Sequence, residues 1–504
     1  MASGIKKLAG QTVIYGLGTI VPRFLNYLLT PLLTYGFTAA EYGINSELYA
    51  YISFLNVIFT YGMETTFFNF SSKLENKQEV YNTALLSLIL SSVFFSLLFL
   101  VFAGSIAEGL STPNSVYLPQ FIIWSVLIVA SDAITAIPFA QLRSENKAMK
   151  FSVLKLSNVI INFGLTIFFL KFCKSSYDNG ETNFMASLYN PEIGIGYAFL
   201  ANLLANCFTL ILLSKQFATL KFSLNIELLK KMLSYAWPLI ILGFAGMINE
   251  TLDRIILKKL IVDKSEAQIA QGVYGACYKI AILMTIFIQA FRFAAEPFFF
   301  NKAKEKDSTK SYALVMKYFV IFCLFLFLAT TLNLEWIKLF IGPNFRSGLN
   351  VVPILLMANL CLGVVYNLAI WYKLNGQTKF GAIIAIVGAI ITIVVNVIFV
   401  PKYSYVASAW ATLAAYAGMM ILSYVLGQKY FPIKYNIRAM TVYTVLALGF
   451  YAISLTYSGM ENTILKVILN NLFVAFFVFI LFKLEFNSLK KLKQNVNTTN
   501  TESS

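Results

Sequence analysis

The stretch from Gln11 to Leu33 (QTVIYGLGTIVPRFLNYLLTPLL) constrains the fold of this chain more than any other feature. About 20 apolar residues suffice for a helix to cross a bilayer, so this stretch is long enough to span a membrane. Arg23 lies near its middle, directly after Pro22. An arginine at the bilayer centre costs roughly 2.5–3.5 kcal/mol on insertion scales, so such a residue usually faces a cavity or a partner. We therefore expect Arg23 to face an internal cavity that the rest of the chain builds.

Apolar runs of similar length recur along all 504 residues, of which 58% are hydrophobic and only 12% charged. A soluble globular protein does not need so much apolar surface, so the composition indicates an all-α integral membrane protein. We count fourteen runs and predict that each is a membrane-spanning helix. They are Gln11–Leu33, Leu48–Phe68, Thr83–Ala103, Tyr117–Phe139, Phe151–Leu170, Ile195–Leu213, Met232–Asn249, Val273–Phe293, Tyr312–Leu332, Val351–Tyr372, Phe380–Val400, Tyr405–Leu426, Met440–Tyr457 and Ile464–Phe482.

The distribution of Lys and Arg predicts on which side of the membrane each loop lies. If the N-terminus is cytoplasmic and the helices alternate, most basic residues outside the runs fall into cytoplasmic segments, as the positive-inside rule requires. We therefore expect both termini on the cytoplasmic side. The segment after the seventh run is an exception, because Lys258, Lys259 and Lys264 would lie outside. We interpret it as the upper half of a long seventh helix that faces an internal space, and a miscounted helix is the alternative.

The composition also narrows the class of function. The formal net charge of +16 would suggest nucleic acid for a soluble protein, but the lysines fall between apolar runs, and we predict no nucleic-acid partner. Histidine is absent and the five cysteines are scattered singly, so we expect no histidine-dependent catalysis and no metal site. No segment between runs is as long as a folded domain. We therefore predict that the chain is not an enzyme and needs no cofactor beyond a coupling H⁺ or Na⁺.

Two short patterns recur six runs apart. The pattern G-[IV]-x-small-x-x-Y occurs at Gly43–Tyr49 and at Gly272–Tyr278. The pattern E-x-x-F-F-N occurs at Glu64–Asn69 and at Glu296–Asn301, one helix further along in both cases. An offset of six helices is even, so both copies have the same orientation in the membrane. The patterns therefore predict a parallel repeat about an axis along the membrane normal, with the binding site at the repeat interface.

The repeat divides the chain into four parts. We predict a first six-helix lobe over residues 1–222 and a second six-helix lobe over residues 223–430, related by a pseudo-twofold axis. Two further helices occupy residues 431–482. The remaining segment, residues 483–504, is basic and then rich in Ser, Thr and Asn, so we expect a disordered cytoplasmic tail.

Arginines inside the runs are the candidates for binding an anionic substrate. Arg23 is either a structural residue bonded to backbone carbonyls or an anion receptor, and the forked donors of its guanidinium suit phosphate oxygens. Arg292, near the end of the eighth run, either extends to the membrane surface or faces the cavity. Pro22 and Pro238 occupy related helices in the two lobes, and we predict a hinge at each.

Acidic residues within the runs, or in the upper half of the long seventh helix, are the candidates for ion coupling. Glu250, Asp253 and Arg254 lie on one face of the seventh helix. One interpretation is a helical ion pair between Glu250 and Arg254, which has the favourable orientation for residues four apart. The other is that the two acids bind a coupling proton or cation while Arg254 contacts an anionic substrate. Asp132, in the fourth run, and Glu64 are further candidates for a proton or cation site.

Four stretches resemble the polysaccharide-exporter members of the MOP (MATE-like) superfamily, and Wzx-type O-antigen and capsule flippases are the nearest in pattern. These stretches are GLGTIVPRFLNYLLTPLLT, the LDRIIL–GVYGACYKI pair between Leu252 and Ile280, FRFAAEPFFF at the end of the eighth run, and the segment from Ile341 to Ala382.

The resemblance implies a flippase of the bacterial cytoplasmic (inner) membrane. Such a protein moves an undecaprenyl-pyrophosphate-linked oligosaccharide to the outer leaflet by alternating access through a cationic cavity. It implies a monomer embedded in membrane lipid, either alone or associated with other polysaccharide-assembly proteins. Onto this chain it transfers a cavity role for Arg23, Asp253 and Arg254.

Two alternatives remain from the residues alone. A MATE-like cation-coupled exporter of small molecules has twelve helices, and neither the last two helices nor a central arginine suits one that exports cationic drugs. A membrane glycan polymerase or glycosyltransferase needs catalytic residues on a sizeable loop, and none is present. The sugar composition of the cargo, lipid II included, and the coupling ion stay open.

Overall fold

The computed structural model describes residues 2–112, 115–303 and 308–501; within them, the side chains of residues 2–15, 17, 19, 294, 297, 300, 301 and 487–501 are not described. Throughout this part of the chain, regular structure is helical apart from one antiparallel bridge between Thr112 and Ser115. The predicted all-α class is therefore confirmed.

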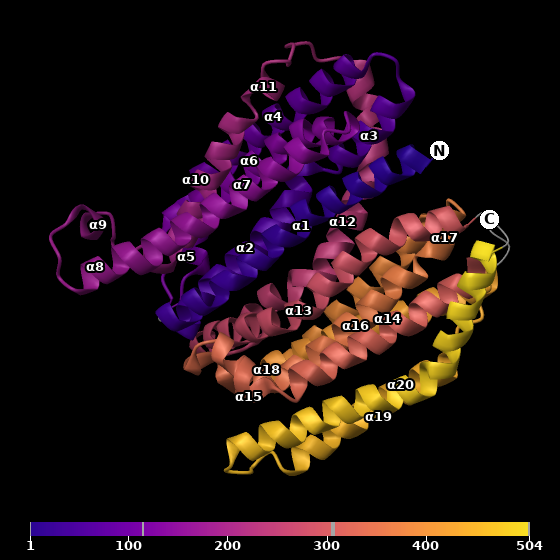
Figure 1. Ribbon diagram of the computed structural model, residues 1–504. Coiled ribbons are helices and arrows are strands. Elements are labelled where there is room, and N and C mark those ends of the chain that lie inside the picture. The colour runs from indigo at the N-terminus through magenta and orange to yellow at the C-terminus, as the bar shows by residue number, and fades with distance from the viewer. Residues whose placement is uncertain (1, 113–114, 304–307, 502–504) are drawn as a thin grey trace.

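The first half of the chain forms the indigo-to-magenta bundle in the upper part of Figure 1. Here α1 packs along α7, α4 along α6, and α10 along both α6 and α7. The elements are α1 (Ala2–Gly36), α2 (Ala39–Thr60), α3 (Met63–Lys73), α4 (Lys77–Val101), α5 (Ala103–Leu110), α6 (Pro119–Ser144), α7 (Ala148–Ile167), the π-helix η1 (Phe168–Cys173), α8 (Lys174–Asp178), α9 (Phe184–Ser187), η2 (Gly194–Gly196), α10 (Tyr197–Leu212) and α11 (Ser214–Phe217).

The second half lies below it, and its last two helices form the yellow hairpin at the lower edge of Figure 1. Here α18 packs along α12 and α16, and α13 packs along α16. The elements are α12 (Ile226–Leu260), α13 (Lys264–Lys302), α14 (Ser308–Thr331), α15 (Leu334–Ile337), η3 (Lys338–Phe340), η4 (Pro343–Val351), α16 (Val352–Leu368), α17 (Ile370–Leu374), α18 (Lys379–Tyr430), α19 (Ile437–Thr456) and α20 (Thr463–Thr501).

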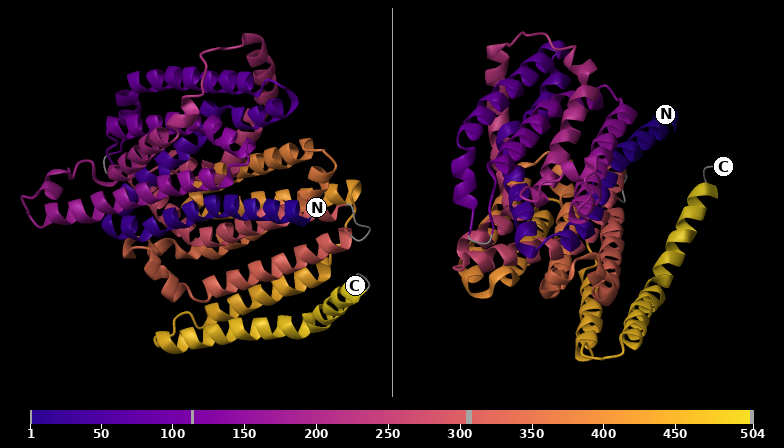
Figure 2. Two further views of the ribbon diagram at one scale, coloured as in Figure 1. Left: turned by 45° about the horizontal axis from the view of Figure 1, so that its top comes forward. Right: turned by 90° about the vertical axis from the view of Figure 1, so that its left-hand side faces the viewer.

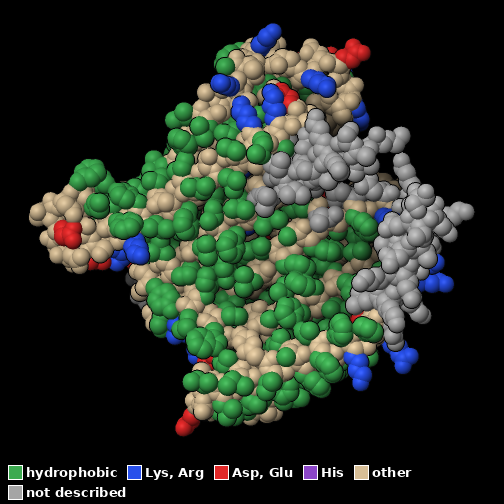
Figure 3. Space-filling view, in the orientation of Figure 1, with side chains coloured by type: hydrophobic (Ala, Val, Ile, Leu, Met, Phe, Trp, Pro, Cys, Tyr) green, Lys and Arg blue, Asp and Glu red, His purple; other side chains and the backbone are tan. Residues whose placement is uncertain are grey.

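Eleven helices of the described chain are long and apolar enough to cross a membrane. They do not include α1 and α2, which contain the first predicted run and most of the second. One of the eleven, α18, has 52 residues and carries the eleventh and twelfth predicted runs on either side of a kink at Ser404, where φ is 52°. The count of fourteen spans therefore stays a prediction. Hydrophobic side chains cover the middle of the face in Figure 3, as a lipid-facing surface requires.

Two expectations about helix length have different outcomes. The long seventh helix is confirmed, because α12 continues to Leu260 and includes Lys258 and Lys259, whereas Lys264 begins α13. The expected disorder after residue 482 is not what the structure shows, since α20 continues as a helix to Thr501. The N- and C-terminal ends lie on the same side of the bundle in Figures 1 and 2, as an even number of crossings requires.

The two halves meet mainly through α2, which packs along α13 and α12. The repeated glycines lie at this contact. A Cβ on Gly272 would lie 1.8 Å from the carbonyl oxygen of Ala39 and 3.2 Å from the backbone nitrogen of Gly43. A Cβ on Gly43 would lie 2.6 Å from the carbonyl oxygen of Gln268. The first repeated pattern therefore needs glycine because the two backbones approach each other across the halves.

The acids of the second repeated pattern have corresponding partners. Glu64 forms an ion pair with Arg143 at the end of α6, and Glu296 forms one with Lys373 in α17, which follows α16. Each basic residue thus lies near the end of the second membrane-spanning helix that follows its acidic partner in the chain. Three residues after each base the backbone is left-handed, at Asn146 (φ 57°) and at Gly376 (φ 67°), and Asn and Gly are the residues that adopt this conformation most readily. These correspondences support a parallel repeat.

Two ion pairs attach the C-terminal hairpin to the second half. Buried Lys317 of α14 pairs with buried Glu485 of α20, which also accepts a 2.5 Å hydrogen bond from the Tyr443 hydroxyl of α19. At the other end of α20, Lys466 donates to Glu335 of α15 over 2.7 Å. Charged residues within the apolar helices thus fix the hairpin against the bundle at two heights.

Candidate functional site

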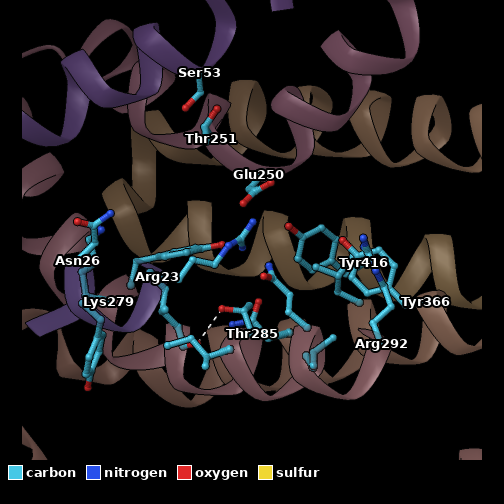
Figure 4. A pocket seen from close by; sticks show the side chains of 18 of the residues that line it. Arg23, Asn26, Ser53, Glu250, Thr251, Lys279, Thr285, Arg292, Tyr366 and Tyr416 are labelled. Carbon is cyan, nitrogen blue, oxygen red and sulfur yellow. Dashed lines mark hydrogen bonds between the residues drawn. The ribbon is translucent and has the colours of Figure 1, made fainter. Parts of the chain in front are cut away.

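A cavity of about 470 Å³ lies between the two halves. Its volume is within the range of about 300–1,000 Å³ that is typical of small-molecule sites. We call it the cationic cavity, and residues of α1, α2, α12, α13, α16 and α18 line it (Figure 4). Its polar and aromatic lining comprises Arg23, Asn26, Tyr27, Ser53, Glu250, Thr251, Arg254, Tyr278, Lys279, Thr285, Gln289, Arg292, Phe293, Asn359, Tyr366 and Tyr416.

The charges of this lining are unbalanced. Among the described residues the cavity has four bases and one acid, Glu250. In Figure 4, Ser53, Thr251 and Glu250 lie along the upper side, and Thr285 and Arg292 lie along the lower side. Between apolar helices the effective dielectric constant is low, so this excess of positive charge strongly favours an anionic ligand.

The structure places Arg23 in the wall of this cavity, where its side chain is exposed. Glu250 attracts the guanidinium and Arg292 repels it. Within the part of the chain that the structure describes, no hydrogen bond or ion pair of the Arg23 guanidinium is found, so no backbone carbonyl takes up its donors. The donors face the cavity instead.

Two further arginines of the cavity lie against tyrosine rings. The Cζ atom of Arg254 is 4.4 Å from the ring centre of Tyr278, and that of Arg292 is 5.0 Å from the ring centre of Tyr366. Such contacts hold a guanidinium plane in place without neutralising it. Arg292 is therefore a cavity residue in this structure, whereas the sequence left two positions open for it.

The acids of α12 separate into two environments. Glu250 lines the cavity, and among the described residues it forms no ion pair with Arg254, so the helical pair considered from the sequence is not formed. Asp253 is buried outside the cavity lining. It accepts a 2.5 Å hydrogen bond from the Tyr274 hydroxyl and a 2.8 Å bond from the backbone N–H of Arg254.

The other predicted ion-coupling residues lie away from the cavity lining. Asp132 lines a separate space of about 20 Å³ beside Lys155, where the Asn206 side-chain amide donates to it over 3.0 Å. Glu64 is in its ion pair with Arg143. Among the described residues no group of three or more His, Cys, Asp or Glu could hold a metal ion.

Both predicted hinge prolines lie inside continuous helices. Pro22 is inside α1 and directly precedes the cavity residue Arg23. Pro238 is inside α12, is exposed, and does not line the cavity. A hinge role for either proline stays a prediction.

Sequence reasoning missed Lys279, which lines the cationic cavity from α13. Its signal was the same as that of Arg23, because it is a base inside an apolar run, seven residues after Gly272 of the repeated pattern. It also missed a second cavity of about 290 Å³, whose lining includes asparagines from four helices. Asn158 and Asn162 have the i, i+4 spacing of one helix face, but no sequence spacing relates this pair to the asparagines of α1, α2 and α10.

Comparison with known proteins gives a family and a fold. The model of a family described as "Polysaccharide biosynthesis protein" matches residues 8–302. No curated protein sequence matches this chain at a significant level.

Among solved structures, the lipid II flippase MurJ in its inward closed conformation superposes with a TM-score of 0.65 at 15% identity, covering 94% of this chain and 99% of MurJ. An inward-facing multidrug-resistance MATE transporter of the MOP superfamily gives a TM-score of 0.58 at 12% identity, covering 83% of this chain and 97% of the transporter. The MATE multidrug transporter DinF-BH gives a TM-score of 0.58 at 15% identity, covering 85% of this chain and 96% of that transporter. The fold is therefore that of MurJ and the MATE transporters.

Proposed function

The chain belongs to the polysaccharide biosynthesis protein family, and from this premise we propose that it is a flippase for undecaprenyl-pyrophosphate-linked oligosaccharide repeat units in the cytoplasmic membrane of a bacterium. The observation that carries the proposal is the cationic cavity between the halves. A solved structure of the same fold, MurJ, is described as a lipid II flippase, which supports a lipid-linked glycan as the class of cargo.

The cavity provides positive charge that would offset the cost of moving the phosphates of such a cargo through the membrane. An unpaired phosphate inside a membrane is prohibitively costly, because a buried charge needs a partner and hydrogen bonds. Arg23, Arg254 and Arg292 offer guanidinium forks that match phosphate oxygens, and Lys279 adds a fourth positive charge. Four bases against one acid leave enough positive charge for a pyrophosphate.

An apolar groove beside the C-terminal hairpin supports a lipid-linked cargo. Its volume is about 460 Å³, and residues of α14, α16, α18 and α19 line it. Apart from two threonines and two tyrosines its lining is wholly apolar, with four methionines among the side chains. Methionine adapts to irregular apolar shapes, which suits a long branched hydrocarbon chain. The polyprenyl chain would thus stay in an apolar environment while the head group enters the cationic cavity.

Glu250 supplies a way to couple transport to an ion. It is the acid that attracts Arg23 across the cavity, so it competes with an anionic cargo for the same guanidinium. A proton or Na⁺ bound by this carboxylate would remove the competition and favour cargo binding. Coupling through Asp253 or Asp132 is disfavoured by their positions outside the cationic cavity.

The test replaces Arg23 by alanine in cells that depend on this chain for surface glycan. Hydrogen bonds to a charged group are worth about 1.5–3 kcal/mol, so we expect export to fall roughly tenfold or more. The matched control is Arg143→Ala, which removes an arginine outside the cavity and leaves export near its normal level. Normal surface glycan at a normal amount of the Arg23→Ala protein would refute the role of this arginine.

The alternatives differ in what the cavity would bind and do. A MATE-like exporter of cationic small molecules conflicts with four bases in the lining, although the MATE transporters share the fold. An enzyme that joins or transfers glycans is disfavoured, because the fold is that of a flippase, MurJ, and of the MATE transporters. Reconstituted protein distinguishes them, because translocation leaves the labelled lipid-linked glycan covalently unchanged.

A further inference from the structure

We propose that the second cavity, which is lined mainly by the first half of the molecule, is a subsite for uncharged sugars of the cargo. This inference rests on the proposed function. We call the cavity the amide chamber, because five of its lining residues are asparagines: Asn26 on α1, Asn45 on α2, Asn158 and Asn162 on α7, and Asn202 on α10. Its volume of about 290 Å³ lies close to the lower limit of typical small-molecule sites.

The amide chamber adjoins the cationic cavity. Both are lined by the same four polar residues, which are Asn26, Ser53, Arg254 and Lys279. A head group whose pyrophosphate contacts the bases therefore has the amide chamber directly beside it. In a pyrophosphate-linked glycan, the sugars are the part of the head group that follows the phosphates, so the order of the two cavities matches the order of the cargo.

The chemistry of the lining selects a neutral ligand with many hydroxyls. Among the described residues its lining contains no acid, and its two bases are those shared with the cationic cavity. A side-chain amide both donates and accepts hydrogen bonds, which matches a sugar hydroxyl, itself both a donor and an acceptor. A cation is disfavoured, because the chamber offers no carboxylate and lies beside Arg254 and Lys279.

One asparagine of the chamber has a polar atom that the described protein leaves without a partner. Asn45 is only 7% exposed, and its side-chain oxygen has no hydrogen-bond partner among the described residues. A buried polar atom that is left unpaired destabilises the folded protein, so such an atom indicates a missing partner. A ligand hydroxyl in the chamber would supply it.

Other amides of the chamber are held in fixed orientations. The Asn158 amide donates to the side-chain oxygens of Asn206 and Thr209, both over 2.9 Å. The Asn202 amide donates to the Tyr49 hydroxyl over 3.2 Å, and the Tyr49 ring stacks on Phe199 with ring centres 5.0 Å apart. Side chains fixed by such supporting contacts bind a ligand without a large loss of their own freedom.

The experiment measures how much a sugar adds to lipid binding. The full-length protein in lipid nanodiscs is titrated with undecaprenyl pyrophosphate alone and with the same lipid carrying glucose, galactose or N-acetylglucosamine. Each neutral hydrogen bond contributes about 0.5–1.5 kcal/mol, so we expect at least one of the sugar-bearing lipids to bind the wild-type protein about tenfold more tightly than the bare lipid.

Two variants test whether the amide chamber is the source of the added affinity for sugar-bearing lipids. Asn45→Leu combined with Asn162→Leu should reduce the gain to less than about twofold and leave binding of the bare lipid unchanged. Asn471→Leu, an exposed asparagine of α20 that lines neither cavity, should retain the full gain. If none of the three sugars improves binding to the wild type, or if the double variant keeps the gain, the sugar subsite is wrong.

The proposed function is tested separately in the same titrations. Arg23→Ala should weaken binding of the bare lipid, whatever the sugars do. If the wild type does not bind undecaprenyl pyrophosphate, or Arg23→Ala binds it normally, the proposed function fails. If the wild type binds the bare lipid and Arg23→Ala weakens that binding, but no sugar adds affinity, only the amide chamber loses its role. The wild-type comparison also decides the matter if the double variant does not fold.

Discussion

The two halves of this molecule meet at two junctions whose chemistry differs. One, the Glu47 junction, joins Glu47 on α2 to Lys258 on α12 through an ion pair. The other, the Glu64 junction, brings α3 and α4 against the first turns of α12. The Glu47 junction is polar and buried, whereas the Glu64 junction is mainly apolar, with one 2.6 Å hydrogen bond from the Asn225 side-chain amide to the Glu79 carboxylate.

The Glu47 junction is a hydrogen-bonded network. The Lys258 ammonium donates to the Glu47 carboxylate over 2.9 Å and to the Leu110 carbonyl over 2.6 Å. The Tyr117 hydroxyl donates to the same carboxylate and accepts a 3.2 Å bond from Gln268. Glu47 is 1% exposed and Lys258 is 7% exposed. One buried ion pair and its hydrogen bonds thus connect residues from five segments of the chain, three in the first half and two in the second.

The Glu64 junction relies mainly on apolar side chains. Met63 and Phe67 of α3 share a cluster with Leu228 and Met232 of α12. The ion pair of Glu64 at this end lies within the first half, as that of Glu296 lies within the second. Apolar contacts depend little on direction and re-form after a small shift, but a buried ion pair is either made or broken. A displacement at the Glu47 junction would therefore break a defined contact, whereas a small displacement at the Glu64 junction would preserve much of its apolar packing.

The largest effect is expected from Lys258→Met, which leaves the Glu47 charge buried without its partner. Breaking a buried pair on one side costs about 3–5 kcal/mol, and this loss should appear in the unfolding free energy measured by titration with SDS. The double variant Glu47→Met with Lys258→Met should recover most of the loss, because apolar residues can replace a buried pair. A double variant as unstable as the single one would contradict this description of the junction.

A smaller effect is expected from Gly272→Ala at the contact between α2 and α13. The added Cβ would lie 1.8 Å from the Ala39 carbonyl oxygen, a backbone atom that cannot turn aside, so we expect a loss of about 1–3 kcal/mol in the same titration. Gly164→Ala is the matched control. No atom lies within 4 Å of its Cβ, and it should stabilise α7 by about 0.5–1 kcal/mol. Equal effects at both glycines would show that backbone approach is not what selects glycine at 272.

The smallest effect is expected from Arg143→Gln, which removes the ion pair within the first half. The Arg143 and Glu64 side chains are 36% and 45% exposed, so water screens their attraction and the loss should be below about 1 kcal/mol. Lys373→Gln should behave alike in the second half, because its pair with Glu296 is similarly exposed. A loss above about 2 kcal/mol for either variant would remove the contrast between the two junctions.

The individual charges show how far the sequence predicts the site. Arg23 was identified because a charge inside an apolar run needs a polar environment. Arg254 was identified because the charged segment after the seventh run was interpreted as part of a long helix that faces an internal space. The same argument selected Glu64, for which the structure shows an ion pair with Arg143 instead of a place in the cavity. It did not select the asparagines of the amide chamber, because a neutral side chain at one position in a helix is compatible with a lipid-facing, a packed or a cavity position.

The sequence by itself determined that the chain is a bundle of apolar helices, where the long helix α12 extends, and that two glycines recur in a parallel repeat. These properties are local, because a helix in lipid satisfies its own backbone hydrogen bonds and its length depends on its own residues. Only the tertiary structure decided that Glu47 pairs with Lys258, 211 residues away, and that asparagines of four helices share one chamber. Which side chains meet depends on how the helices are rotated and displaced relative to one another, and packing of the whole bundle sets both.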